Sequence, residues 1–107
     1  MPAEWEPHEL TLMGWPTETR RHALWHDQLG VARSVHATIA AAIARFEPVL
    51  MVANPDDVDH AQRACGDEVE VVALDIDDSW FRDSGPVFVR DGGRRVGIDF
   101  GFNAWGD

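Results

Sequence analysis

Residues 69–86 read VEVVALDIDDSWFRDSGP, and the rest of the chain is arranged around them. Residues 69–74 form a short, valine-rich run, which predicts a β-strand. Residues 87–89 form a second such run after the Gly85-Pro86 break, and they also predict a strand. The acidic and aromatic segment between the two runs, residues 77–86, is therefore predicted to be a loop held by two strands. Such loops commonly present functional side chains on a rigid frame.

This loop has two interpretations. Acidic residues followed by Ser, Gly and Pro often form solvated turns that have no function. Trp80 and Arg82 beside Asp83 favour a second interpretation, a receptor for a planar organic cation. A carboxylate accepts paired N–H bonds from such a cation, and the face of an aromatic ring attracts its charge. Arg82 is then expected to orient Asp83 or to satisfy backbone carbonyls.

The residues before the loop predict alternating strands and helices. Residues 10–15 and residues 49–53 predict buried strands, the second covered on both faces. A helix is predicted between them, with Asp27 as its N-cap and an end at Pro48. Its apolar stripe recurs at three- and four-residue steps and consists of Leu29, Ala32, Val35, Ile39, Ile43 and Phe46.

Three further features complete the expected fold. Residues 54–57, Asn-Pro-Asp-Asp, are a typical helix start, and the short helix they open is expected to stop at Gly66. Residues 87–90 and 94–100 predict a hairpin around Asp91-Gly92-Gly93. The order of elements predicts an α/β or α+β fold. His36 is expected to be a half-buried packing residue beside the helix stripe.

Composition and charge restrict the classes of function. A chain of 107 residues has room for one domain with a modest core, and its 45% hydrophobic and 26% charged residues are ordinary for a globular protein. The net charge of −10 argues against nucleic-acid binding and favours a cationic ligand. A cytoplasmic location is expected, because no apolar stretch is long enough for a membrane span, the start lacks signal-peptide features, and one cysteine cannot form an internal disulfide.

Several motifs resemble those of one enzyme family. Residues 80–86, WFRDSGP, resemble the W-x-R-D-x-G-P segment of the agmatine deiminases and of their bacterial peptidyl-arginine deiminase relatives. Residues 1–9 are similar to the opening of an agmatine deiminase. Trp15-Pro16, residues 43–49 (IARFEPV) and residues 101–106 (GFNAWG) also match. The motifs occur in the family's order and cover nearly the whole chain.

The resemblance implies a specific α/β architecture. Members of this family are pentein-type α/β propellers, in which ββαβ modules surround a central active site. Their chains are several-fold longer than 107 residues. Residues 1–107 would then cover the first module and the start of the second, as the N-terminal part of a catalytic domain. The alternative is a domain that is completed by another chain.

The resemblance also implies a reaction. The complete enzyme would hydrolyse agmatine to N-carbamoylputrescine and ammonia through a covalent amidino intermediate on a cysteine, with a histidine to move protons. Two carboxylates clamp the guanidinium, and no metal or organic cofactor is implied. Asp83 matches the first carboxylate, which makes it the candidate catalytic and substrate-binding residue, and Trp80 would form a wall of the substrate pocket.

The other residues of the family's site are expected outside residues 1–107. Cys65 does not match the nucleophile and is expected to be a structural thiol, and none of the five histidines lies in a His-x-Asp element. Asp78 is expected to brace the loop. Asn103 and Trp105 lie in a motif that borders the family's active site, and the sequence assigns them no role.

Two alternatives to an agmatine deiminase remain open. The first is a peptidyl-arginine deiminase or another guanidine-modifying enzyme of the same superfamily. The second is a non-catalytic acidic module that binds a partner. A calcium site at Asp75, Asp77 and Asp78 lacks the ligand series of an EF-hand. The oligomeric state is also open, with a homo-oligomer among the alternatives.

Overall fold

A computed structural model describes residue 3, residues 5–18 and residues 25–103 of the chain. The chain divides into two compact units, one formed by His8–Ser79 and the other by Met1–Pro7 together with Trp80–Asp107. The first unit contains a parallel sheet and two longer helices. The second unit contains one helical turn and a hairpin. The mixed α/β fold predicted from the sequence is confirmed.

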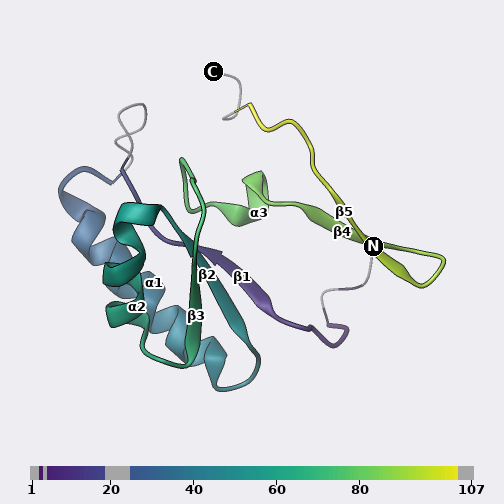
Figure 1. Cartoon of the computed structure of the whole chain (residues 1–107), viewed down its shortest axis with the longest axis horizontal. Helices are drawn as coiled ribbons and strands as arrows, with labels where there is room; N and C mark the ends of the chain where they lie inside the picture. The colour runs from purple at the N-terminus through teal and green to yellow at the C-terminus, as the bar shows by residue number, and fades with distance from the viewer. Residues whose placement is uncertain (1–2, 4, 19–24, 104–107) are drawn as a thin grey trace. The chain divides into compact units, whose positions relative to one another are not determined.

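The sheet of the first unit has three parallel strands in the order β1-β2-β3. They are β1 (Thr11–Gly14), β2 (Val49–Ala53) and β3 (Val69–Ala73). Helix α1 (Leu29–Ala44) connects β1 to β2, and helix α2 (Val58–Cys65) connects β2 to β3. Figure 1 shows both helices on the same side of the sheet. All three strands therefore end at the same edge, and their following loops start there.

The core lies between the sheet and the two helices. Alternate strand residues point to this side, as the two-residue period of a strand requires. Trp15 and Met51 are fully buried, and Trp15 directly follows β1. The helices contribute mainly small side chains, which allow them to lie close to the sheet. The buried cluster consists of Trp15, Ala37, Ala40, Val49, Met51, Ala53, Ala61, Cys65 and Val69.

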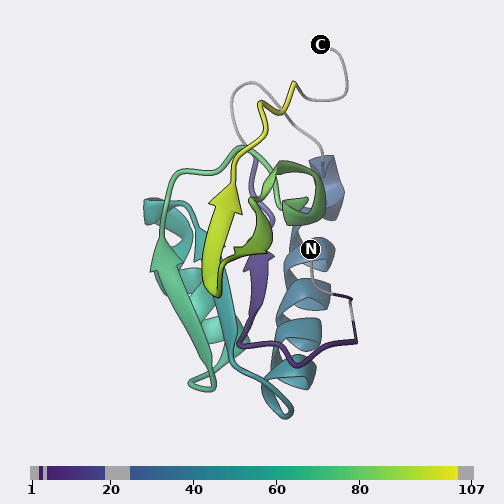
Figure 2. The ribbon, with the colours of Figure 1, turned by 90° about the vertical axis from the view of Figure 1, so that its right-hand side faces the viewer.

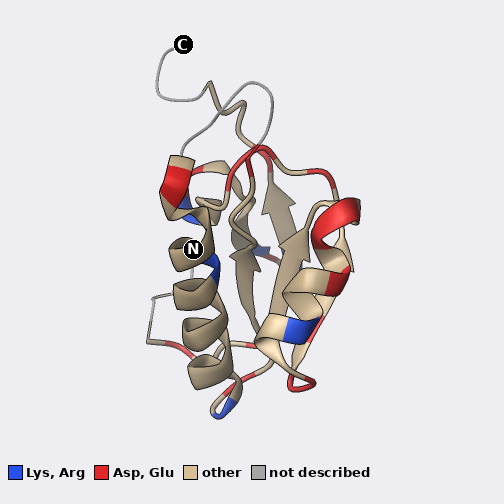
Figure 3. Cartoon of the chain, turned by 90° about the vertical axis from the view of Figure 1, so that its left-hand side faces the viewer, with Lys and Arg blue, Asp and Glu red and all other residues tan. Residues whose placement is uncertain are grey.

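Helix α1 is present as predicted, but its buried face is only partly the predicted stripe. Ala32 is buried and Ile43 packs against the core, whereas Val35 and Ile39 are exposed and Phe46 is 86% exposed. The buried line is carried by the alanines at positions 37 and 40. An alanine-rich helix has apolar residues on most sides, so its periodicity does not define one face. Figure 3 shows that α1 carries almost no charged residues, so charge does not mark its exposed face either.

The start of α1 also differs from the prediction. A 3₁₀ turn, His26–Gln28, precedes the helix, so the N-cap position falls on Gln28 and not on Asp27. No side-chain hydrogen bond caps this end. His36 is half-buried as predicted. Its Nδ1 lies 2.9 Å from the carbonyl oxygen of Ala32, and its ring meets the Trp25 ring edge-on. Among the described helices, none is both long enough and apolar enough to cross a bilayer.

The predicted start of the second helix is confirmed. Asn54 precedes a 3₁₀ turn, Pro55–Asp57, that continues into α2. The helix ends at Gly66, whose φ of 83° is unfavourable for residues with a side chain.

The second unit contains the predicted hairpin. Strands β4 (Val87–Asp91) and β5 (Arg94–Ile98) pair antiparallel, as Figure 2 shows. The turn between them is the glycine pair 92–93, with φ angles of 52° and 82°. Two consecutive positive φ angles are typical of the tight turns that match the twist of a hairpin, and glycine adopts them without strain.

A pH dependence of stability follows from Glu47, two residues before β2. Hydrogen bonds from Thr11 and then from His8, whose positive charge adds to the effect, hold the pKa of Glu47 below its ordinary value. At a pH between the two pKa values, the unfolded chain binds more protons than the folded chain. The contribution of Glu47 to stability is therefore present above the ordinary carboxyl pKa and is lost as pH falls through the lowered pKa. We expect Glu47→Gln to make the melting temperature less sensitive to pH below about 4.5. An equal change in the melting temperatures of wild type and variant between pH 6 and pH 3 contradicts this expectation.

Candidate functional site

The segment 80–84 forms a helical turn that the sequence did not predict. Helix α3 (Phe81–Ser84) is a single turn, and the carbonyl oxygen of Trp80 accepts hydrogen bonds from the backbone N–H groups of Asp83 and Ser84, both 3.0 Å long. The Ser84 hydroxyl donates to the same oxygen. Three donors therefore converge on one carbonyl, which explains how four residues without apolar periodicity hold a helical turn.

Gly85 ends this turn because its backbone passes close to the turn itself. The Gly85 N–H donates to the carbonyl oxygen of Phe81 at 2.9 Å. A Cβ atom at position 85 would lie 2.5 Å from that oxygen, which is inside van der Waals contact. The Gly-Pro pair of the motif thus has a structural role: glycine permits the close approach, and Pro86 cannot continue the helix.

The helical turn brings the backbone positions of Trp80 and Asp83 close together. They are three residues apart around one turn, a spacing that places side chains on neighbouring parts of a helix surface. Asp83 is exposed, and Trp80 has 52% of its surface exposed. An exposed carboxylate and a half-exposed indole on one turn can bind a planar cation through N–H bonds and through the ring face. That these two residues bind a substrate remains a prediction.

The end of the first unit leads into this turn. Asp78 is partly buried, and its Oδ1 accepts a hydrogen bond of 2.6 Å from the backbone N–H of Ser79. This bond joins adjacent residues, and the role of Asp78 as a brace of the loop stays a prediction. Asp77 is exposed. In the second unit Asn103 is exposed and lies outside helices and strands, and Trp105 lies outside the described residues.

Polar side chains gather where the three parallel strands end. Thr17 follows β1 and is 3% exposed, and Asn54 follows β2. The Asn54 Nδ2 donates to Thr17 Oγ1 at 3.0 Å, and the Thr17 hydroxyl donates to Asp57 Oδ2 at 3.3 Å. Arg33 of α1 completes the group, since its Nη2 donates to Asp57 Oδ1 at 2.7 Å. Every link in this chain joins segments that are far apart in sequence.

Arg33 also fixes the segment that follows β1. Its Nε donates to the carbonyl oxygen of Pro16 at 2.9 Å, and its guanidinium lies 5.8 Å from the centre of the Trp15 ring. Nη1 lies 3.2 Å from Nδ1 of His60. An arginine with this many partners is held in one orientation, and it ties α1 to the end of β1 and to the start of α2.

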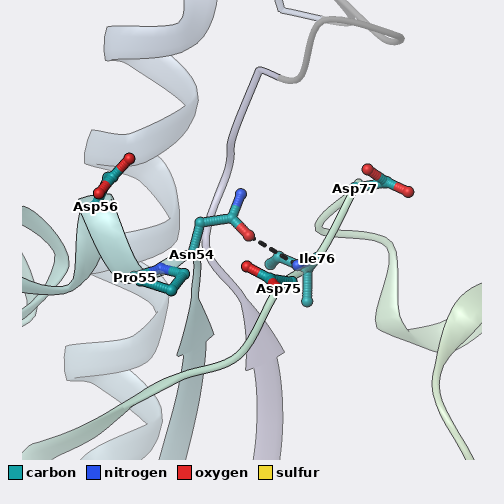
Figure 4. A pocket seen from close by; sticks show the side chains of 6 residues that line it. All are labelled: Asn54, Pro55, Asp56, Asp75, Ile76 and Asp77. Carbon is teal, nitrogen blue, oxygen red and sulfur yellow. Dashed lines mark hydrogen bonds between the residues drawn. The ribbon is translucent and has the colours of Figure 1, made fainter.

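An open pocket of about 540 Å³ lies at the same edge of the sheet. Figure 4 shows its lining, with Asn54 directed towards Ile76 and with Asp56 and Asp77 on opposite sides. The lining residues are Asn54, Pro55, Asp56, Asp75, Ile76 and Asp77. Within the described ranges, no group of three or more His, Cys, Asp or Glu side chains is arranged to hold a metal ion.

The sequence interpretation missed the group formed by Thr17, Arg33, Asn54 and Asp57. One signal was available: Asn54 directly follows a predicted strand, Thr17 comes two residues after another, and the ends of parallel strands meet at one edge. Arg33 could not be found in this way, because its partners are 17 to 27 residues away in the chain.

The comparison with known proteins covers the whole chain. Residues 1–107 match the family described as Porphyromonas-type peptidyl-arginine deiminase. The chain belongs to this family. Among curated members of the deiminase group, the agmatine deiminase of Stutzerimonas stutzeri is 47% identical over 109 residues and that of Pseudomonas aeruginosa is 46% identical over 108 residues. Each alignment covers 99% of this chain but only 28% of the relative.

A solved deiminase structure has the same fold over this region. The agmatine deiminase of Enterococcus faecalis superposes with a TM-score of 0.87 at 34% identity, covering 99% of this chain and 28% of that one. The chain therefore spans between a quarter and a third of the length of the relatives it matches. The family predicted from the motifs is confirmed.

Cys65 lies at the end of α2 in the buried cluster that also contains Ala61 and Val69. Burial raises the pKa of the Cys65 thiol, which disfavours the reactive thiolate. We expect iodoacetamide to label Cys65 at least tenfold more slowly in the folded chain than in urea. Equal rates at neutral pH contradict this assignment. The same thiol is expected to be irrelevant to ammonia release, so Cys65→Ser leaves any such activity unchanged.

Proposed function

We propose that this chain is the N-terminal part of an agmatine deiminase. The complete enzyme hydrolyses agmatine to N-carbamoylputrescine and ammonia. The proposal is carried by one observation: identities of 46% and 47% to proteins named agmatine deiminase extend over 99% of the chain and include the turn that presents Trp80 and Asp83. A net charge of −10 suits a cationic substrate.

In this proposal Asp83 is one of two carboxylates that hold the guanidinium. Its oxygens accept N–H bonds from the substrate and orient the guanidinium carbon towards the nucleophile. Trp80 packs its ring against the cation or its aliphatic stem. The nucleophilic cysteine, the histidine and the second carboxylate come from outside residues 1–107. The complete protein is then an α/β propeller of repeated modules, with this chain as the first module and the start of the next.

Residues 1–107 alone are therefore inactive. A guanidinium carbon is shielded by resonance, and without a thiolate directed at it no covalent route is available. The thiol of Cys65 is buried and protonated, and it has no matching role in the family.

A second candidate function is the hydrolysis of peptidyl arginine, because the matching family is described by that activity. Ammonia release by the complete protein from agmatine, free arginine and an arginyl peptide separates the candidates. Agmatine as the preferred substrate supports the proposal, and a preferred arginyl peptide supports the second candidate. Turnover of none of the three overturns both and leaves a non-catalytic acidic module.

The role of Trp80 is open to a direct test. If the ring packs on the cation, Trp80→Ala in the complete enzyme weakens agmatine binding by about 0.5–2 kcal/mol, whereas Trp80→Phe retains most of the affinity because an aromatic face remains. Steady-state KM values and melting temperatures of both variants measure this. Equal losses in the two variants, at unchanged stability, rule out stacking and point to the indole N–H.

A further inference from the structure

One further backbone hydrogen bond continues the pairing of β2 and β3 beyond the end of β3. The backbone N–H of Leu74 donates to the carbonyl oxygen of Ala53 at 3.0 Å. In a parallel ladder the next donor lies two residues further, at Ile76, and its acceptor would be the carbonyl of Pro55. Pro55 instead begins a 3₁₀ turn, closed by the Asp57 N–H on the carbonyl of Asn54, so the backbone leaves the ladder here.

The side chain of Asn54 replaces the missing backbone acceptor. The Ile76 N–H donates to Asn54 Oδ1 at 2.7 Å, as Figure 4 shows. The other end of the amide is fixed as well, because its Nδ2 donates to the buried Thr17 hydroxyl at 3.0 Å. Thr17 in turn donates to Asp57, which is paired with Arg33. Asn54 is thereby held in the one orientation that presents its oxygen to Ile76.

We propose that Asn54 is a positioning residue for the segment that leads from β3 to Trp80 and Asp83. Its bond to the Ile76 N–H fixes the backbone where the chain leaves β3. Ile76 precedes Trp80 by only four residues, so this bond restricts where the segment that leads to the candidate substrate-binding turn begins. The inference rests on the proposed function, in which that turn binds the guanidinium.

Two substitutions separate the positioning bond from the rest of the side chain. Asn54→Ala removes the acceptor and leaves the Ile76 N–H without its partner. Asn54→Asp keeps an oxygen for Ile76 and can accept from the Thr17 hydroxyl, which then no longer donates to Asp57. We expect kcat/KM for agmatine to fall about tenfold or more in Asn54→Ala and to stay within about threefold of wild type in Asn54→Asp.

The experiment uses the complete enzyme and a control at the opposite end of β3. Val69 is 1% exposed, belongs to the core cluster and begins β3, so Val69→Ala destabilises the same sheet without touching the Asn54 bond. Melting temperature, kcat/KM for agmatine and hydrogen exchange of the Ile76 amide are measured for all four proteins. Asn54→Ala is expected to lose both amide protection and activity, and Val69→Ala to lose stability with kcat/KM unchanged.

Two results overturn the inference. The first is a kcat/KM in Asn54→Ala equal to that of wild type. The second is a loss of kcat/KM in Val69→Ala that is as large, for the same loss of stability, as the loss in Asn54→Ala. Failure of the proposed function has a different signature, since wild type itself then turns over no agmatine. In that case hydrogen exchange of the Ile76 amide still tests the role of Asn54. Equal protection of this amide in wild type and Asn54→Ala shows that Asn54 does not position the segment.

Discussion

Asp83→Asn in the complete enzyme is expected to lower agmatine turnover by about 10²- to 4 × 10³-fold while leaving the fold intact. The carboxylate would lose its charge and one of its two acceptor oxygens, and breaking a desolvated ion pair costs about 3–5 kcal/mol, at about 1.4 kcal/mol for each tenfold in rate. The fold does not depend on this side chain. Apart from the bond of the Ser84 hydroxyl, the hydrogen bonds that hold α3 join backbone groups, and asparagine at position 83 keeps its backbone N–H.

A matched control lies in the same segment. Asp77→Asn removes the same charge from an exposed aspartate six residues earlier, to which the resemblance assigns no catalytic role. Ammonia release by wild type and both variants should show a large loss only for Asp83→Asn. A folded Asp83→Asn enzyme that stays within tenfold of wild type would refute the assignment of Asp83, as would equal losses in the two variants.

The second large effect concerns stability. Trp15→Ala is expected to lower the free energy of unfolding by about 3–5 kcal/mol, because the side chain is fully buried and its removal leaves a large cavity. The ring also meets the edge of His60 and the guanidinium of Arg33, so the segment after β1 would lose its packing. Urea unfolding of the chain measures the change.

Trp15→Phe provides the comparison. The indole Nε1 is buried and has no hydrogen-bond partner among the described residues, so it contributes no favourable bond. Phenylalanine keeps an aromatic ring and removes this unsatisfied N–H, which partly offsets the lost volume. We expect it to cost less than half as much as alanine. Equal losses in the two variants would mean that the indole N–H, and not the volume of the ring, is the stabilising feature.

The sequence predicted the elements of the fold well because several signals agreed. The valine-rich strands, the Asn-Pro-Asp-Asp helix start and the Gly-Gly turn each specify local structure, and each is present. The buried face of α1 was only partly predicted. Alanines occur on most sides of this helix, and the sheet packs against Ala37 and Ala40. The turn at 81–84 was missed because its hydrogen bonds come from a short local arrangement without periodicity.

The candidate site was predictable in part for a similar reason. Trp80 and Asp83 were found because they belong to one short motif. The group formed by Thr17, Arg33, Asn54 and Asp57 comes from three separate segments, and its members meet only after the sheet has formed. Such long-range polar contacts have no local sequence signal.

A structure of the complete protein with agmatine bound would show directly whether Asp83 holds the guanidinium. We expect the two carboxylate oxygens of Asp83 to lie about 2.7–3.2 Å from guanidinium nitrogens, with the Trp80 ring within about 6 Å of the cation. A guanidinium bound by other carboxylates, with Asp83 directed to solvent, would contradict it.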